Sequence, residues 1–88
     1  MWKIDRDYIA EPGEPSRVGV SGEVLHYSSI PKIRFRMLDD DSIVYYGGWL
    51  NDDPDCANQF SALSFGTYDA GCTTIEVKRE GEWVQEIG

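Results

Sequence analysis

The sequence predicts a mainly β protein: a small single-domain antiparallel sheet or partly open barrel of five or six strands, with at most one short helix. Three observations lead to this prediction. The chain has 88 residues, enough for one hydrophobic core, so residues 1–88 are expected to form a single domain. Short segments of alternating apolar and polar residues are separated by clusters of Gly, Pro, Asp and Asn. The chain is 41% hydrophobic and 12% aromatic, which excludes an acidic disordered protein.

The first third of the chain divides at a proline-rich turn. Residues 11–16, Glu-Pro-Gly-Glu-Pro-Ser, interrupt regular structure and separate an N-terminal segment from the rest. Residues 17–20 predict a short strand, and residues 23–27 predict another, with a bulge or turn at Ser21-Gly22. Residues 28–31 then form a connection whose final proline sets the start of the next strand.

The strongest strand signal is the strict alternation over residues 32–37. It places Ile33, Phe35 and Met37 on one face and the basic stripe Lys32, Arg34 and Arg36 on the other. Residues 39–42, Asp-Asp-Asp-Ser, predict a turn because Asp is poor in strands and readily bonds its own backbone. Residues 43–46 are β-branched and aromatic and predict the returning strand.

The register of this hairpin stays open at the level of sequence. A loop of two or four residues would pair Phe35 with Tyr46, whereas a loop of three would pair Phe35 with Tyr45. Gly47-Gly48 is expected to end or kink the second strand.

The second half of the chain starts with a loop. Residues 51–55, Asn-Asp-Asp-Pro-Asp, could cap a short helical turn from Pro54 to Phe60. Residues 61–71 contain no long periodic run and are expected to be loop, with room for one short strand. Residues 73–78 and 82–87 predict a second hairpin.

The turn of this second hairpin is Glu80-Gly81. A two-residue turn would set Val77 opposite Val84 and Lys78 opposite Trp83, a reasonable cross-strand set.

The net charge of −8 is local. The stretch from Met37 to Val77 contains no Lys or Arg, and outside it eight acids balance eight bases. The acids within the stretch are Asp39, Asp40, Asp41, Asp52, Asp53, Asp55, Asp69 and Glu76. Charge that is concentrated in one stretch affects which partners the protein attracts, whereas scattered charge mainly affects solubility.

We expect a non-enzymatic protein-interaction or accessory module. Two acidic loops flank an aromatic strand, and Tyr and Trp are enriched at binding hot spots. The expected contact residues are Asp39, Asp40, Asp41, Tyr45, Tyr46, Trp49, Asp52, Asp53 and Asp55. The partner is expected to be another protein, and a protein with a basic surface is one such partner. Alternatively, the acids could imitate nucleic-acid phosphates and inhibit a DNA- or RNA-binding protein, or simply keep the domain in solution.

The basic stripe has two interpretations as well. It could grip an anion or an acidic partner, or it could be the solvent face of an amphipathic strand whose charges are offset by nearby acids. Net acidity disfavours direct binding to nucleic acid or to anionic lipid. No apolar run is long enough to span a bilayer, and residues 1–7 lack an apolar signal core, so we expect a cytoplasmic protein. An exposed sheet edge would be compatible with a homodimer.

A small enzyme that uses Cys72 or His26 is a third alternative function, and metal binding by the acidic runs is another. The acidic runs do not match a calcium loop, and no metal or other cofactor is expected. Cys56 and Cys72 could close a disulfide, although a cytosolic setting favours two reduced thiols. His26 is the lone histidine, and no spacing links it to either cysteine for thiol- or His-dependent chemistry.

The chain resembles a group of small uncharacterised bacterial proteins that are often carried on plasmids or other mobile elements. The resemblance lies in residues 2–7, in Arg34-Phe35-Arg36, Asp39-Asp40-Asp41 and Tyr45-Tyr46, and in Phe65-Gly66, Ala70-Gly71-Cys72-Thr73, Ile75, Gly81 and Trp83. Residues 62–64, Ala-Leu-Ser, are less acidic here than is usual in that group. The resemblance implies no activity, catalytic residue or ligand, and favours a bacterial, cytosolic and accessory protein.

Overall fold

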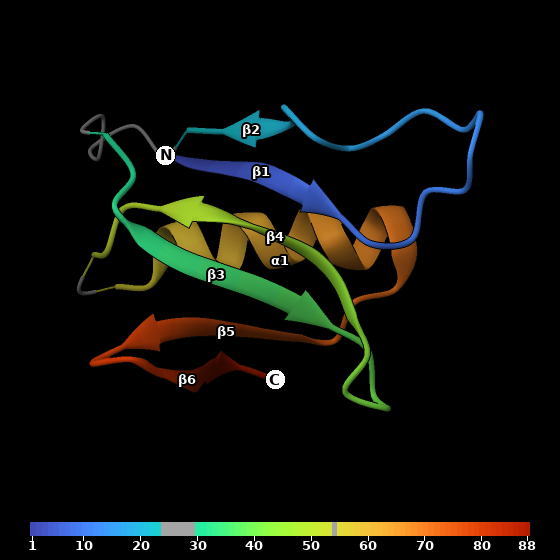
Figure 1. The fold of residues 1–88 in the computed structure, drawn as a ribbon. Coiled ribbons are helices and arrows are strands. Elements are labelled where there is room, and N and C mark those ends of the chain that lie inside the picture. The colour runs from blue at the N-terminus through green and yellow to red at the C-terminus, as the bar shows by residue number, and fades with distance from the viewer. Residues whose placement is uncertain (24–29, 54) are drawn as a thin grey trace.

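The fold is one open antiparallel sheet of six strands with a helix packed on it (Figure 1). The computed structural model describes residues 1–23, 30–53 and 55–88. The strands are β1 (Trp2–Asp7), β2 (Ser21–Gly22), β3 (Ile33–Leu38), β4 (Val44–Leu50), β5 (Thr74–Arg79) and β6 (Glu82–Ile87), in the spatial order β2-β1-β4-β3-β5-β6. The helix α1 (Ala57–Ala70) connects β4 to β5. The predicted fold class is therefore confirmed.

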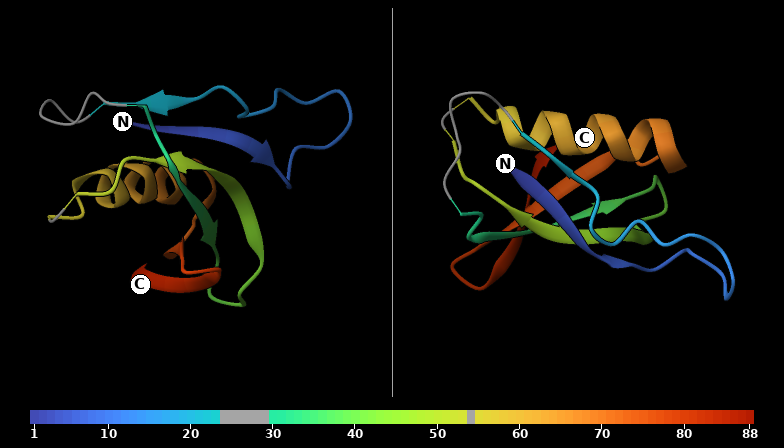
Figure 2. Two further views of the ribbon diagram at one scale, coloured as in Figure 1. Left: turned by 60° about the vertical axis from the view of Figure 1, so that its left-hand side comes forward. Right: turned by 90° about the horizontal axis from the view of Figure 1, so that it is seen from above.

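The sheet curls around α1. The left panel of Figure 2 shows β1 and β2 on one side of the helix and β5 and β6 on the other. The helix contacts both edge strands, β2 and β6, as well as the central strand β4. It thus fills the concave side of the sheet, and the convex side faces away from the helix.

The core lies between α1 and the concave face. Phe35 and Met37 of β3 are fully buried there, as the alternation predicted, and Ile33 is partly buried beside them. The remaining core residues are Trp2, Ile4, Tyr46, Leu50, Ala62, Leu63, Cys72, Ile75 and Val77. Burying this apolar surface contributes roughly 25 cal/mol per Å² and is the main source of stability.

The β3–β4 register differs from both predicted alternatives. Phe35 pairs with Gly48, and the register shifts near the turn, where Leu38 pairs with Val44. The difference includes one extra residue, Tyr45, at this shift, and the turn beyond it is ordered by the Asp39 carboxylate. Its Oδ1 accepts hydrogen bonds from the backbone N–H groups of Asp41 and Ile43, each at 2.9 Å.

Gly47-Gly48 does not end β4, because the strand continues to Leu50, but the β1–β4 register shifts opposite these two glycines. A Cβ on Gly48 would lie 2.0 Å from the carbonyl oxygen of Lys3 and 2.8 Å from the Phe35 ring. Glycine at this position is therefore what lets β1 and β3 approach β4 closely enough to pair.

The prediction of loop over residues 61–71 is also wrong, since α1 extends to Ala70. Its buried residues, Asn58, Gln59, Ala62, Leu63 and Gly66, recur at helical spacing, but two of them are polar. Phe60 and Tyr68 meanwhile face solvent. This exchange of polar and apolar positions hides the helical period in the sequence.

The N-terminal third holds a further correction. Residues 17–20 form a turn, with the Val20 N–H donating to the Arg17 carbonyl, and not the predicted strand. Instead, Ser21-Gly22 forms the short strand β2 and pairs with β1. The predicted strand over residues 23–27 falls almost entirely outside the described residues. The second hairpin is confirmed, with Val77 opposite Val84 and Lys78 opposite Trp83.

Candidate functional site

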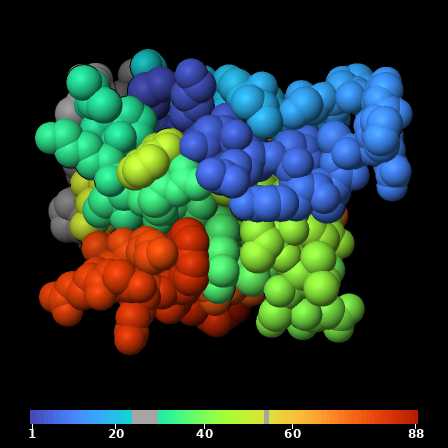
Figure 3. Space-filling view, viewed as in Figure 1, coloured from blue at the N-terminus to red at the C-terminus, as the bar shows by residue number. Residues whose placement is uncertain are grey.

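The convex side of the sheet presents a row of basic and aromatic side chains that α1 does not cover. Figure 3 shows this side, with β1 in blue, β3 in green and β6 in red. The strand register places Lys3, Trp49 and Arg34 side by side, and Arg6, Gly47, Arg36, Glu76 and Gln85 in the adjacent row. We call the outward-facing residues Lys3, Asp5, Arg6, Arg34, Arg36, Gly47, Trp49, Glu76, Lys78 and Trp83 the open face.

One end of the open face is a cluster of Arg34, Trp49 and Asp5. The Arg34 guanidinium lies 4.6 Å from the centre of the Trp49 ring, and its Nη1 donates to Asp5 Oδ2 at 2.6 Å. The Trp49 indole Nε1–H donates to the same oxygen at 3.0 Å. Asp5 sits where the β1–β4 register shifts, so the irregularity aims its carboxylate at both groups.

The other end is a cluster of Arg36, Trp83 and Glu76. The Arg36 guanidinium lies 4.3 Å from the centre of the Trp83 ring, and its Nε donates to Glu76 Oε1 at 2.6 Å. The Lys78 Nζ lies 5.4 Å from the centre of the same ring. Stacking on a ring and pairing with a carboxylate together hold each arginine in one orientation.

A hollow of about 290 Å³ separates the two clusters. Its lining residues are Tyr8, Arg34, Phe35, Arg36, Val44, Gly47 and Trp83. Gly47 leaves the space open, because the nearest atom to a Cβ placed there would be the Phe35 carbonyl oxygen at 3.6 Å. The hollow is thus bordered by two guanidinium groups and by aromatic and aliphatic side chains.

The open face is positive although the chain is acidic. Its bases are Lys3, Arg6, Arg34, Arg36 and Lys78, and its acids are Asp5 and Glu76. Five positive charges less two negative ones give +3, against −8 for the whole chain. The sign of the local charge is therefore opposite to that of the molecule.

The structure does not bring the two acidic loops together. Residues 39–41 precede β4 and residues 52–55 come after it, so the two loops lie at opposite ends of this strand, as Figure 1 shows. Of the nine residues expected to contact a partner, Trp49 lies on the open face. The exposed carboxylates of Asp40 and Asp41 are at the β3–β4 turn, and that of Asp55 is beyond the far end of β4.

The other expected contact residues take part in internal interactions. Asp53 is buried, and its carboxylate accepts hydrogen bonds from the N–H groups of Ala57 and Asn58 at the start of α1. Both carboxylate oxygens of Asp52 accept from Arg79 at 2.9 Å. The Tyr45 hydroxyl donates to Asp39 Oδ2 at 3.0 Å.

Tyr46 is buried and belongs to a small polar cluster near the C-terminal end of α1. Its hydroxyl donates to Asp69 Oδ2 at 2.6 Å, and Arg17 Nε donates to the same oxygen at 2.9 Å. Burial and the hydrogen bond to Asp69 raise the pKa of Tyr46, while Arg17 and Tyr46 lower the pKa of Asp69. The cluster fastens residues 8–20 to the helix.

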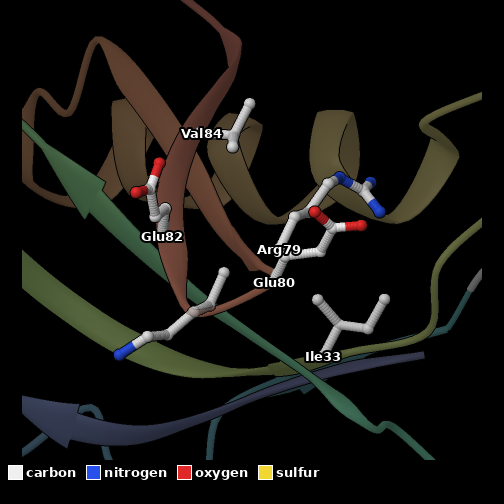
Figure 4. Close-up of a pocket in the computed structure, with 6 residues that line it drawn as sticks. Ile33, Arg79, Glu80, Glu82 and Val84 are labelled. Carbon is white, nitrogen blue, oxygen red and sulfur yellow. The ribbon is translucent and has the colours of Figure 1, made fainter.

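A wider hollow of about 750 Å³ lies between β3 and the β5–β6 hairpin (Figure 4). Its lining residues are Ile33, Lys78, Arg79, Glu80, Glu82 and Val84. The charges around it have both signs, and Arg79 is engaged with Asp52 and Glu86. These side chains make a surface of mixed charge.

The pKa values of both thiols are raised, with burial as the main cause. Cys56 and Cys72 are both free, so the disulfide alternative is excluded. Cys72 is completely buried, and burial raises the pKa of its thiol to about 11. Such a thiol stays protonated near neutral pH and is a poor nucleophile. His26 lies outside the described residues, and within these no group of three metal-ligating side chains gathers.

The residues that sequence reasoning missed are Asp5, Glu76 and Trp83 as partners of the basic stripe. The predicted pairing of Lys78 with Trp83 already indicated that these two side chains lie on one face of the sheet.

Among the described residues, no helix is both long and apolar enough to cross a membrane. No family model, curated protein or solved structure matches this chain.

Proposed function

We propose that this domain is a non-enzymatic protein-interaction module that binds its partner through the open face. The observation that carries the proposal is the pair of tryptophans, Trp49 and Trp83, each stacked by an arginine on the side of the sheet away from α1. Trp, Tyr and Arg are the residues most enriched at binding hot spots. Because ion pairs already hold the arginines in place, less side-chain entropy is lost on binding.

The open face supports this function better than the acidic loops do. Asp52 and Asp53 already serve the fold, and the carboxylates with free oxygens are divided between two ends of β4. This division also weighs against the nucleic-acid mimic, which requires carboxylates at regular spacing on one face. The resemblance to bacterial mobile-element proteins supports an accessory role in the cytoplasm.

Affinity capture tests the proposal with three forms of the full chain. The native chain, Trp49→Ala/Trp83→Ala and Phe60→Ala/Tyr68→Ala are immobilised and exposed to extract of the host, and the bound proteins are quantified by mass spectrometry. Phe60 and Tyr68 are exposed on α1, so the last variant removes two aromatic rings away from the open face. Circular dichroism checks that all three forms are folded.

We expect a specific protein to be retained by the native chain and by the helix variant. The tryptophan variant should recover at least tenfold less of it, because hot-spot tryptophans dominate binding. Equal recovery by both variants would reject the open face as the contact surface.

A further inference from the structure

We propose, building on the function above, that the open face selects an acidic segment of its protein partner, and that the hollow over Gly47 receives a carboxylate side chain of that segment. Charge is the first argument. A surface of +3 on a chain of −8 attracts negative groups locally while the rest of the molecule repels them. A short acidic segment is therefore attracted to the open face and repelled by the rest of the molecule's surface.

The unused donors of Arg34 and Arg36 are the second argument. Arg34 uses Nη1 for Asp5, and Arg36 uses Nε for Glu76. A guanidinium carries five N–H groups in a rigid plane, so donors remain on both side chains at the border of the hollow. Hydrogen bonds between guanidinium and carboxylate are short and roughly twice as strong as neutral ones.

The shape of the hollow is the third argument. Gly47 leaves space above β4, and Tyr8, Val44 and Trp83 supply apolar walls. Such walls would cover the methylene groups of an Asp or Glu side chain and exclude water from its carboxylate. Exclusion of water strengthens the pairing with the two arginines.

The position of the acidic loops favours a protein segment over nucleic acid. Asp39–Asp41 and Asp52–Asp55 lie at the two ends of β4, so a phosphate chain running along the strands would meet negative charge at both ends. A segment with two or three carboxylates matches the charge of the open face without extending to either loop.

Nuclear magnetic resonance of the ¹⁵N-labelled full chain tests the inference directly. Three probes are titrated: a blocked hexapeptide of alternating Glu and Leu, the matched peptide of alternating Gln and Leu, and a dodecamer of thymidylate. We expect the acidic peptide alone to shift the Gly47 amide and the Trp49 and Trp83 indole signals, and the shifts to diminish as salt is added. Equal shifts with the Gln peptide, or tighter binding of the oligonucleotide, would overturn the proposal.

Variants locate the carboxylate. Arg36→Gln removes donors, and Gly47→Leu fills the hollow; each should weaken binding of the acidic peptide at least fivefold. Lys32→Gln makes the same charge change within the basic stripe, at an exposed residue that does not line the hollow, and should weaken binding less than twofold. Unchanged binding by the folded Arg36 and Gly47 variants would reject the hollow as the carboxylate site.

The two proposals fail in different ways. If Trp49→Ala/Trp83→Ala loses the captured partner while Arg36→Gln and Gly47→Leu retain it, the interaction function stands and the acidic-segment inference is wrong. If the tryptophan variant retains the partner, the interaction function itself is wrong.

Discussion

Arg36 and Trp83 are stacked although β5 lies between their strands, with the guanidinium 4.3 Å from the ring centre. The Arg36 Nε also donates to Glu76 on that intervening strand. One side chain therefore joins β3, β5 and β6 across the convex side of the sheet. The Arg36 side chain is therefore held in one orientation on the open face, which is uncommon for a solvent-exposed charge.

Arg36 and Trp83 should be energetically coupled. In a double-mutant cycle with Arg36→Gln and Trp83→Leu, we expect a coupling free energy of about 0.5–1 kcal/mol, the usual range for an exposed cation–π pair. Urea unfolding of the four proteins measures it. Additive effects within about 0.3 kcal/mol would mean that the stacking does not contribute to stability.

Gly48 and Gly47 should respond very differently to an added methyl group. Gly48→Ala places its Cβ against the Lys3 carbonyl, so we expect a loss of about 1–3 kcal/mol or more. For a domain of this size, that loss lowers the melting temperature by roughly 4–20 °C. Gly47→Ala meets nothing closer than 3.6 Å and should melt within a few degrees of the native chain. Similar melting temperatures for both variants would contradict the close β1–β4 approach.

Asp53 should matter for stability where Asp55 does not. Asp53→Ala removes the acceptor for the first N–H groups of α1 and should cost about 1–2 kcal/mol. The Asp55 carboxylate is exposed, so Asp55→Ala should change the free energy of unfolding by less than about 0.5 kcal/mol. The comparison is made by chemical denaturation. A larger effect at Asp55 would rule out Asp53 as the residue that holds the start of α1.

Asp69 should make stability depend on acid pH. Hydrogen bonds from Arg17 and Tyr46 lower its pKa in the folded state, relative to about 3.9 in the unfolded chain. Its ionised form therefore contributes stability above about pH 4, and the contribution is lost as the pH falls through the folded-state pKa.

The variant Asp69→Asn tests this dependence. We expect it to be less stable than the native chain at pH 7 and to lose less stability between pH 5 and pH 2. Asp40→Asn, at an exposed turn position, should be as stable as the native chain at pH 7. Parallel acid profiles for the native chain and Asp69→Asn would contradict the assignment.

The two thiols should differ in accessibility. In native protein at pH 8, a thiol-specific disulfide reagent should modify Cys56 slowly, because burial is the main cause of its raised pKa. Cys72 should react only after unfolding, since it is fully buried and its pKa is raised to about 11. Cys56→Ser should abolish the native reaction. Rapid modification of Cys72 would point to an opening of the core.

The sequence predicts the second hairpin because its turn is decided locally. Glu80 and Gly81 both adopt positive φ, 52° and 82°, as in a two-residue hairpin turn, and the pairing of Val77 with Val84 follows. The first hairpin is not local in this sense. There the register shifts between Met37 and Leu38, and the Asp39 side chain accepts from the Asp41 and Ile43 N–H groups. Strand propensities indicate neither feature.

The helix and the site depend on tertiary structure. Asn58 and Gln59 are buried although they are polar, and their amide nitrogens donate to Asp53 and Glu86, so polarity at these positions wrongly indicated exposure. The alternation over β3 correctly placed Arg34 and Arg36 on one face. Their tryptophan partners followed only from the sheet order, since Trp49 lies on β4 and Trp83 two strands beyond β3 on the other side.

The contact of α1 with both edge strands has a consequence for how the molecule opens. Neither β2 nor β6 can separate from the sheet without exposing part of the helix, and the helix cannot leave without exposing the whole core. Local fraying and global unfolding are thus coupled. Amides of β1, β3, β4 and β5 should consequently exchange with solvent deuterium through one common cooperative opening, rather than in a graded series from edge to centre.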